Sequence, residues 1–126
     1  MLARRAPRFT TPASHRALPR YSGVVVSARG AADVTHNDVY SNWGPGIALC
    51  LHGRARVHRN LLHHGLEAGV LVSSSDAAAS IEDNDVCANE RPGVVVLANA
   101  DPSVRGNRFR DGRENGVWVY LSLIHI

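Results

Sequence analysis

Carboxylates and histidines are the side chains of this sequence that could do chemistry. Four carboxylates could act as an acid–base pair on a glycosidic bond if two of them converged: Asp38, Glu82, Asp83 and Asp85. Five histidines could bind a metal ion if their ring nitrogens converged: His36, His52, His58, His63 and His64. The sequence shows no Ser-His-Asp set, phosphate-binding loop or nucleotide-binding motif. Whether either set of side chains converges depends on the secondary-structure elements on which the residues lie.

An internal repeat organises the chain. One series is made of glycines at spacings of 23 or 24 residues: Gly23, Gly46, Gly69, Gly93 and Gly116. A second series is made of asparagines at the same spacings: Asn37, Asn60, Asn84 and Asn107. Both series take up their one extra residue in the same unit, which begins at Gly69. Independent coincidence would not do this, so the repeat is genuine.

Within each unit, apolar residues alternate with a period of two, which indicates short β-strands and not helices. Four aliphatic columns recur, and their members in the unit that begins at Gly46 are Ile47, Leu49, Val57 and Leu62. Three short strands in 23 residues predict one coil of a parallel β-helix, in which equivalent residues stack about 4.8 Å apart. The fold class is all-β, with about four and a half coils and with the aliphatic columns facing inward.

Two further columns belong to the turns. Asn42, Gly65, Asn89 and Gly112 follow the last aliphatic column by three residues, and their types predict a bend with positive φ at that position. The column that ends at Asn107 contains no glycine, so its side chain is needed. We expect its four asparagines to form a structural ladder, in which each amide bonds to its neighbour one coil away.

The stacking of coils also predicts where the candidate carboxylates and histidines lie. Alignment of the units places Glu82 beside Arg105, Arg59 beside Asp83, and Asp85 beside Arg108, which predicts exposed ion pairs. Asp38 and Asp85 share a column but lie two coils apart, or about 9.6 Å. His63 and His64 are expected at an outward turn, and His52 at the opposite bend. We therefore expect no catalytic residues, no metal site and no cofactor.

One outward column is apolar and is the best candidate for a functional surface. It stands two residues after each repeat glycine and consists of Val25, Ala48, Leu71, Val95 and Trp118. Exposed apolar patches commonly mark contact surfaces. We expect Val25, Leu71, Val95 and Trp118 to bind a protein partner. Two alternatives stay open: the column could be covered by another part of the protein, or β-propensity alone could select these residues.

The motif G-[VI]-x-[VL] followed by V/I-x-x-N-x-[VLF]-x-x-[NG] resembles the repeat of right-handed parallel β-helices of the pectate-lyase-like class. The segments HNDVYSN and DNDVCAN are most similar to the β-helix region of F-box ubiquitin-ligase adaptors. The resemblance covers residues 23–120 and implies a right-handed parallel β-helix. In the adaptors this region is associated with binding proteins destined for ubiquitination. No segment of this sequence resembles an F-box, and the fold also serves lyases and hydrolases.

Composition sets the remaining expectations. Residues 1–22 carry five arginines and no acid, whereas residues 23–126 carry nine arginines and eleven acids, so the repeat region gives no reason to expect nucleic-acid binding. Residues 1–22 are expected to be a basic disordered segment; organelle targeting is the alternative, and an intracellular location is favoured. No apolar run is long enough to span a membrane. Cys50 and Cys87 fall at different phases of the repeat, which predicts free thiols.

The sequence thus predicts three regions: residues 1–22, the β-helix of residues 23–120, and an off-pattern tail of residues 121–126. Because the fifth unit stops after its first strand, we expect the chain to be a fragment of a longer protein. The favoured function is a non-catalytic scaffold that binds protein partners, as part of an adaptor such as a ubiquitin-ligase component. The alternative is a carbohydrate-active β-helix, either an enzyme fragment or a sugar-binding module.

Overall fold

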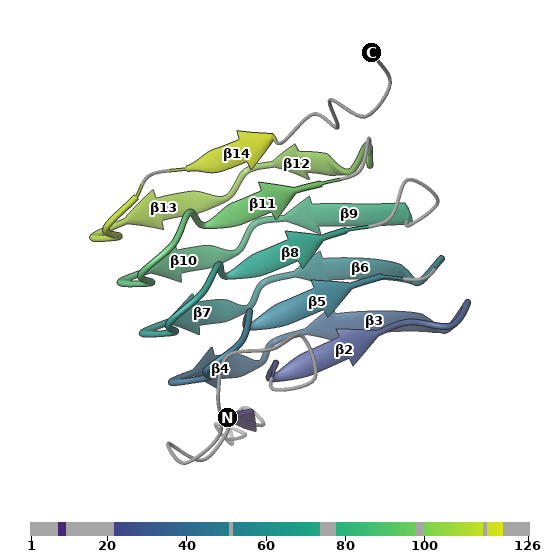
Figure 1. The fold of residues 1–126 in the computed structure, drawn as a ribbon, viewed down its shortest axis with the longest axis horizontal. Coiled ribbons are helices and arrows are strands. Elements are labelled where there is room, and N and C mark those ends of the chain that lie inside the picture. The colour runs from purple at the N-terminus through teal and green to yellow at the C-terminus, as the bar shows by residue number, and fades with distance from the viewer. Residues whose placement is uncertain are drawn as a thin grey trace, which may run out of the picture.

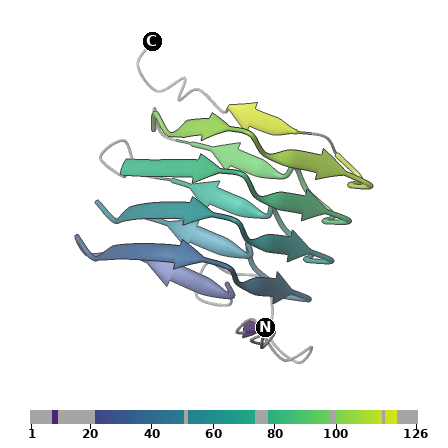
Figure 2. The same cartoon turned by 180° about the vertical axis from the view of Figure 1, so that it is seen from behind.

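The chain forms a stack of coils in which three parallel sheets enclose a narrow core (Figure 1). The computed structural model describes residues 8–9, 22–50, 52–73, 78–97, 100–114 and 116–119. Each of the four complete coils contributes one strand to each sheet, and seen from behind the coils keep the same order from end to end (Figure 2). The predicted parallel β-helix is confirmed.

The strands fall into three sets, one for each sheet. Sheet B contains β2 (Val24–Val26), β5 (Ile47–Leu49), β8 (Val70–Val72), β11 (Val94–Val96) and β14 (Val117–Val119). Sheet C contains β3 (Ala31–Thr35), β6 (Arg54–His58), β9 (Ala78–Glu82) and β12 (Ser103–Arg105). Sheet A contains β1 (Arg8–Phe9), β4 (Asp38–Tyr40), β7 (Leu61–His63), β10 (Asp85–Cys87) and β13 (Arg108–Arg110).

The register of the sheets follows the repeat. Ile47 pairs with Val24 on one side and with Val70 on the other, so equivalent residues of successive units lie next to each other. The inward columns of the central coils are fully buried: Ile47, Leu49, Val57, Leu62, Val70, Ile81 and Val94 are each 0 % exposed. A buried aliphatic side chain of this size stabilises the fold by about 1.5–3 kcal/mol. Stacked aliphatic layers are therefore the main source of stability.

The recurring glycine is explained by close approach between coils. A Cβ atom on Gly46 would lie 2.8 Å from the carbonyl oxygen of Gly69, and one on Gly69 would lie 2.8 Å from that of Gly93. Real Cβ atoms do not come so close to a carbonyl oxygen. The backbone of each coil thus occupies the space that a side chain on the glycine of the preceding coil would need.

The positive φ angles lie one residue before the predicted column. They occur at Ser41 (56°), His64 (53°), Ala88 (53°) and Asp111 (54°), so the prediction for Asn42, Gly65, Asn89 and Gly112 is wrong. The physical reason for asparagine in this column is its buried amide. Asn89 accepts a hydrogen bond from the Gly65 backbone N–H (2.9 Å) and donates one to the Leu62 carbonyl (3.1 Å). The amide satisfies backbone groups at the corner, and the residue before it adopts the left-handed conformation.

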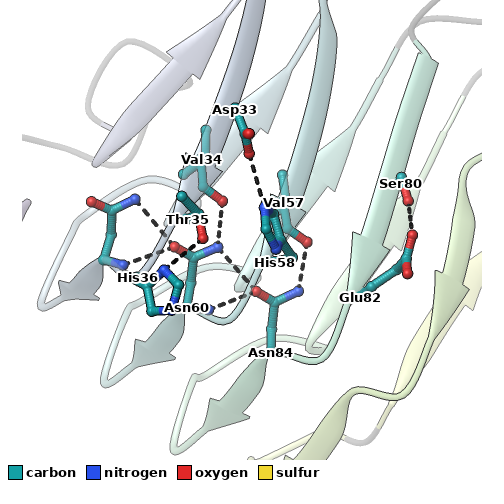
Figure 3. A network of polar contacts seen from close by, with 11 residues as sticks. Asp33, Val34, Thr35, His36, Val57, His58, Asn60, Ser80, Glu82 and Asn84 are labelled. Carbon is teal, nitrogen blue, oxygen red and sulfur yellow. Dashed lines mark hydrogen bonds and ion pairs between the residues drawn. The ribbon is translucent and has the colours of Figure 1, made fainter.

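The four asparagines of the other column form a continuous ladder. Figure 3 shows its central members, Asn60 and Asn84. The backbone N–H and the side-chain NH₂ of Asn60 both donate to Oδ1 of Asn84, at 2.9 and 3.0 Å. The same NH₂ group donates to the carbonyl of Val34, and Asn84 repeats the pattern with Asn107 and Val57. Each hydrogen bond contributes about 1 kcal/mol net, and a buried donor left unpaired costs about 1–3 kcal/mol. A glycine or an alanine could not replace these amides.

Both ends of the stack differ from its middle. Arg8–Phe9 form β1, which pairs in parallel with β4 and places Arg8 opposite Asp38. Apart from these two residues and Ser22, the predicted segment of residues 1–22 lies outside the described residues. At the other end, Val117 and Val119 stand in inward columns yet are 43 % and 55 % exposed, because no described coil follows them. The predicted tail of residues 121–126 also lies outside the described residues.

Two smaller sequence predictions concern thiols and membranes. Cys50 and Cys87 are free thiols, and Cys87 is buried on sheet A. Burial raises the pKa of the Cys87 thiol, which therefore stays protonated at neutral pH. The described residues contain no helix long and apolar enough to cross a membrane.

Candidate functional site

The apolar outward column lies along the outer face of sheet B. Register pairs join its five members in one line, from Val25 to Ala48, Leu71, Val95 and Trp118. Val25 and Trp118 are exposed at 42 % and 41 %, and Leu71 and Val95 are half-buried. Ala48 is 1 % exposed and adds no accessible surface. The four residues expected to contact a partner are thus accessible, and their line is interrupted at β5.

A groove of about 220 Å³ lies on this face. Its lining includes the apolar residues Leu71, Val95, Leu97 and Trp118 and two charged residues, Glu67 and Arg91. The Arg91 guanidinium carbon lies 5.9 Å from the centre of the Trp118 ring, within the range of a cation–π contact. Apolar anchors with a polar border are typical of the centre and rim of protein interfaces.

Arg91 is a candidate residue that the sequence analysis did not single out. A signal for it exists in the repeat, because Glu67, Arg91 and Glu114 all stand two residues before a repeat glycine. This column places charges of alternating sign next to the apolar column. The position of Arg91 at the corner before sheet B could have been predicted from the repeat. Its contact with Trp118 depends on side-chain conformation, which the repeat does not give.

The outer faces of the other two sheets are polar. On sheet A, His63 donates to Asp38 (2.8 Å), and Arg110 donates twice to Asp85 (3.0 and 2.9 Å). On sheet C, His58 pairs with Asp33 at 2.9 Å, and the Ser80 hydroxyl donates to Glu82 (Figure 3). The partners in the three carboxylate contacts made by histidine or arginine lie one coil apart, so coil stacking aligns polar as well as apolar groups.

The candidate carboxylates do not form a catalytic pair. The pKa of Asp85 is lowered, first by the hydrogen bonds from Arg110, and that of Glu82 is lowered, first by the bond from Ser80 and then by Arg105. A general acid that works near neutral pH needs a raised pKa, whereas the pKa values of both Asp85 and Glu82 are lowered. Asp38 and Asp85 face different partners on β4 and β10, with Leu61 between them in register. The geometry favours exposed ion pairs over acid–base catalysis.

None of the three predicted ion pairs forms between its predicted partners among the described residues. The Glu82 carboxylate accepts from Ser80, no ion pair joins Arg59 to Asp83, and Asp85 has a different partner. Asp85 and Arg108 are neighbours in register, as expected, but the carboxylate of Asp85 is bound by Arg110. Arg110 stands two residues further along β13, and its long side chain reaches back diagonally to present two N–H groups to one carboxylate. Bidentate geometry of this kind is stronger than a single contact and decides the pairing.

The histidines are spread over two outer faces. His58 lies on sheet C and His63 on sheet A, while His36, His52 and His64 occupy turns with positive φ. Among the described residues, no group of three or more histidine, cysteine, aspartate or glutamate side chains converges on one point. His63 and His64 do approach each other, with 2.7 Å between their Nδ1 atoms.

The three-sheet coil, the inward aliphatic columns and the asparagine ladder decide the family. A family model described as a right-handed β-helix region matches residues 10–124. The chain belongs to the right-handed β-helix family. No curated protein and no solved structure matches it. Membership establishes the coil and its hand, and it leaves the activity open because right-handed β-helices carry many functions.

For a right-handed β-helix, function must be argued from the outer faces, since packing fixes the inner columns. Two features of this chain qualify. One is the apolar groove on sheet B with Arg91 at its border, and the other is the group of Asp38, His63 and His64 on sheet A.

Proposed function

We propose that this right-handed β-helix is a non-catalytic scaffold that binds a protein partner on the outer face of sheet B. The observation that supports this most is the contrast between faces. Short parallel strands carry mainly Asp, Arg and His outward on sheets A and C, but Val, Leu and Trp outward on sheet B. β-Propensity alone would act on all three faces, so it does not account for one apolar face.

The groove favours a protein over a small ligand. Its anchors lie in a line that crosses successive coils at about 4.8 Å per coil. Large apolar side chains and tryptophan contribute most of the binding energy at protein interfaces when a polar rim excludes water. Here Leu71, Val95 and Trp118 provide the anchors, and Glu67 and Arg91 provide the rim. A partner with an apolar surface and an acidic group opposite Arg91 would match this face.

The resemblance to F-box adaptors supports a finer version of this proposal. In those proteins the β-helix region is associated with binding proteins destined for ubiquitination. The partner of this chain would then be a ubiquitination substrate, held on sheet B by a β-helix that belongs to a larger adaptor. This finer version depends on the resemblance in the repeat motif alone.

A double substitution on sheet B tests the proposal. In Leu71→Asp/Val95→Asp we expect capture of partner proteins from a native extract to fall at least tenfold, because two carboxylates replace the central anchors. Both side chains point outward, so the circular dichroism spectrum should stay that of a β-protein. Leu66→Asp is the matched control, since Leu66 is an exposed leucine in the turn after β7.

Two outcomes would overturn the proposal. One is undiminished capture by the folded double variant, which would show that the interface lies elsewhere. The other is specific retention of oligogalacturonides by the wild-type chain but not by the double variant. That result would favour the carbohydrate-binding alternative on the same face.

A further inference from the structure

A chain of three polar side chains lies on the outer surface of sheet A. The Nε2 atom of His63 is 2.8 Å from Oδ1 of Asp38, which lies one coil away on β4. The Nδ1 atom of the same ring is 2.7 Å from Nδ1 of His64. Asp38 and His63 are both partly buried, with side-chain exposures of 25 % and 19 %, and His64 is exposed at the turn. This surface is separate from sheet B and does not depend on the proposed function.

The contact with Asp38 fixes which His63 nitrogen carries the proton. An ionised carboxylate only accepts hydrogen bonds, so the Nε2 atom of His63 must donate. In the neutral ring, Nδ1 of His63 then has a lone pair that points toward His64. The two Nδ1 atoms share one proton in this arrangement, and a carboxylate holds the far side of the inner ring.

Both rings are held in position by their surroundings. The His63 ring stacks on Tyr40 from the preceding coil, with ring centres 5.1 Å apart and planes 16° from parallel. His64 follows immediately in the left-handed conformation (φ 53°), and its backbone N–H donates to the carbonyl of Cys87. The tight turn therefore brings two consecutive side chains to the same side, where their rings meet edge to face.

We propose that His63 and His64 bind a divalent transition-metal ion of the Cu²⁺ type through their Nδ1 atoms, with Asp38 as the positioning residue. Metal binding releases the shared proton to solvent, the ion lies to one side of the line between the two Nδ1 atoms, and solvent completes its coordination. A carboxylate that accepts from the other nitrogen of a ligating histidine is the usual outer partner of such a ligand, because it sets the tautomer and raises the basicity of the ring.

The distance between the nitrogens discriminates between metals. Two metal–nitrogen bonds of about 2.0 Å, a length typical of zinc–histidine bonds, set about 2.8 Å between nitrogens at a right angle and about 3.3 Å at a tetrahedral angle. The 2.7 Å between the hydrogen-bonded rings is nearer to the right-angle value, so a tetragonal ion needs the smaller rearrangement when it replaces the proton. Tetragonal nitrogen and oxygen sites favour Cu²⁺ or Ni²⁺, and Cu²⁺ binds most tightly of the first-row divalent ions.

Neighbouring groups agree with this assignment. The carboxylates of Asp38 and Asp85 favour a positive charge beside His63, and Arg110 on the same face is bound to Asp85. Cys87 is the register neighbour of His63 and is 7 % exposed, but among the described residues it forms no group of three potential ligands with the two histidines. His58 also has a carboxylate partner, Asp33, on the other face.

The test is a titration of the full chain with CuSO₄ in a weakly coordinating buffer, followed by calorimetry and by electron paramagnetic resonance. We expect the wild type to bind one ion with hyperfine structure from two nitrogens. His64→Ala should bind at least tenfold more weakly and lose one nitrogen, and Asp38→Asn should bind about 10- to 100-fold more weakly. His36→Ala is the matched control, because His36 is also an exposed turn histidine with positive φ (55°), and its affinity should not change.

Each remaining outcome would overturn part of the proposal. If the wild type and His64→Ala bind Cu²⁺ with equal affinity, the proposed metal site is wrong. It is also wrong if His36→Ala loses as much Cu²⁺ affinity as His64→Ala. A loss in His64→Ala without a loss in Asp38→Asn would leave the ligands and remove the positioning role of the carboxylate. His64 is exposed, so its substitution is expected to leave the fold intact, and far-ultraviolet circular dichroism checks this.

Discussion

The outer face of sheet B and the outer face of sheet A are built from the same coils, yet they carry opposite chemistry. Sheet B presents Leu71 and Val95 outward from the middle of their strands, and sheet A presents Asp38 and Asp85 outward from the first position of theirs. Inside, the two sheets are alike, with buried valine or leucine in every central coil. In a β-helix, packing dictates the inner columns and leaves the outer columns free. The outer columns are therefore where the function of this family member must be sought.

The largest expected effect compares two consecutive residues of one strand. Val70 is 0 % exposed and its neighbour Leu71 points outward. Val70→Asp should unfold the chain, because a buried unpaired carboxylate costs several kcal/mol and a domain of this size has only about 5–15 kcal/mol of stability. Leu71→Asp should change the free energy of unfolding by less than about 1 kcal/mol.

Urea denaturation followed by circular dichroism measures both variants. If Leu71→Asp lowers the free energy of unfolding as much as Val70→Asp does, the distinction between inward and outward residues is wrong, since Leu71 would then be part of a core. It is equally broken if Val70→Asp folds with wild-type stability.

The smallest expected effect concerns the ion pair between Asp85 and Arg110 on the polar outer face of sheet A. The pKa of Asp85 is lowered in the folded state, mainly by hydrogen bonds from Arg110. The pair therefore adds stability above the unfolded-state pKa of about 3.9, and this contribution is lost as the pH falls through the lower folded-state pKa. Since both side chains are more than a third exposed, at 39 % and 35 %, we expect only about 0.5 kcal/mol.

Unfolding free energies of the wild type and Arg110→Ala, taken at pH 7 and at pH 2, measure this contribution. The difference between the two proteins should be present at pH 7 and vanish at pH 2. A difference that persists at pH 2 would assign the effect to packing of the arginine stem and not to its charge.

The sequence predicts the inside of this molecule well. Two spaced series, one of glycine and one of asparagine, give the length of the coil, and the alternation around Ile47 and Leu49 gives the direction of its side chains. These features are predictable because stacking forces every unit to solve the same packing problem. The register that places Val25 in line with Trp118 follows from the same rule.

Contacts on the outside are harder to predict. The turn residues with positive φ include Ser41 and Ala88, whose types give no sign of that conformation, while the neighbouring amide of Asn89 serves the backbone instead. The pairing of Asp85 with Arg110 in place of Arg108 depends on how a long side chain folds across the sheet. Side-chain conformation is not periodic, so the repeat does not determine it.

Photo-crosslinking from one outward position on each sheet tests the central claim most directly. A photoreactive residue at Val95 on sheet B should cross-link to the bound protein partner, whereas the same residue at Leu61 on sheet A or at Arg56 on sheet C should not. Cross-links of equal yield from all three positions, or from Leu61 and Arg56 but not from Val95, would contradict the assignment of the apolar face as the binding surface.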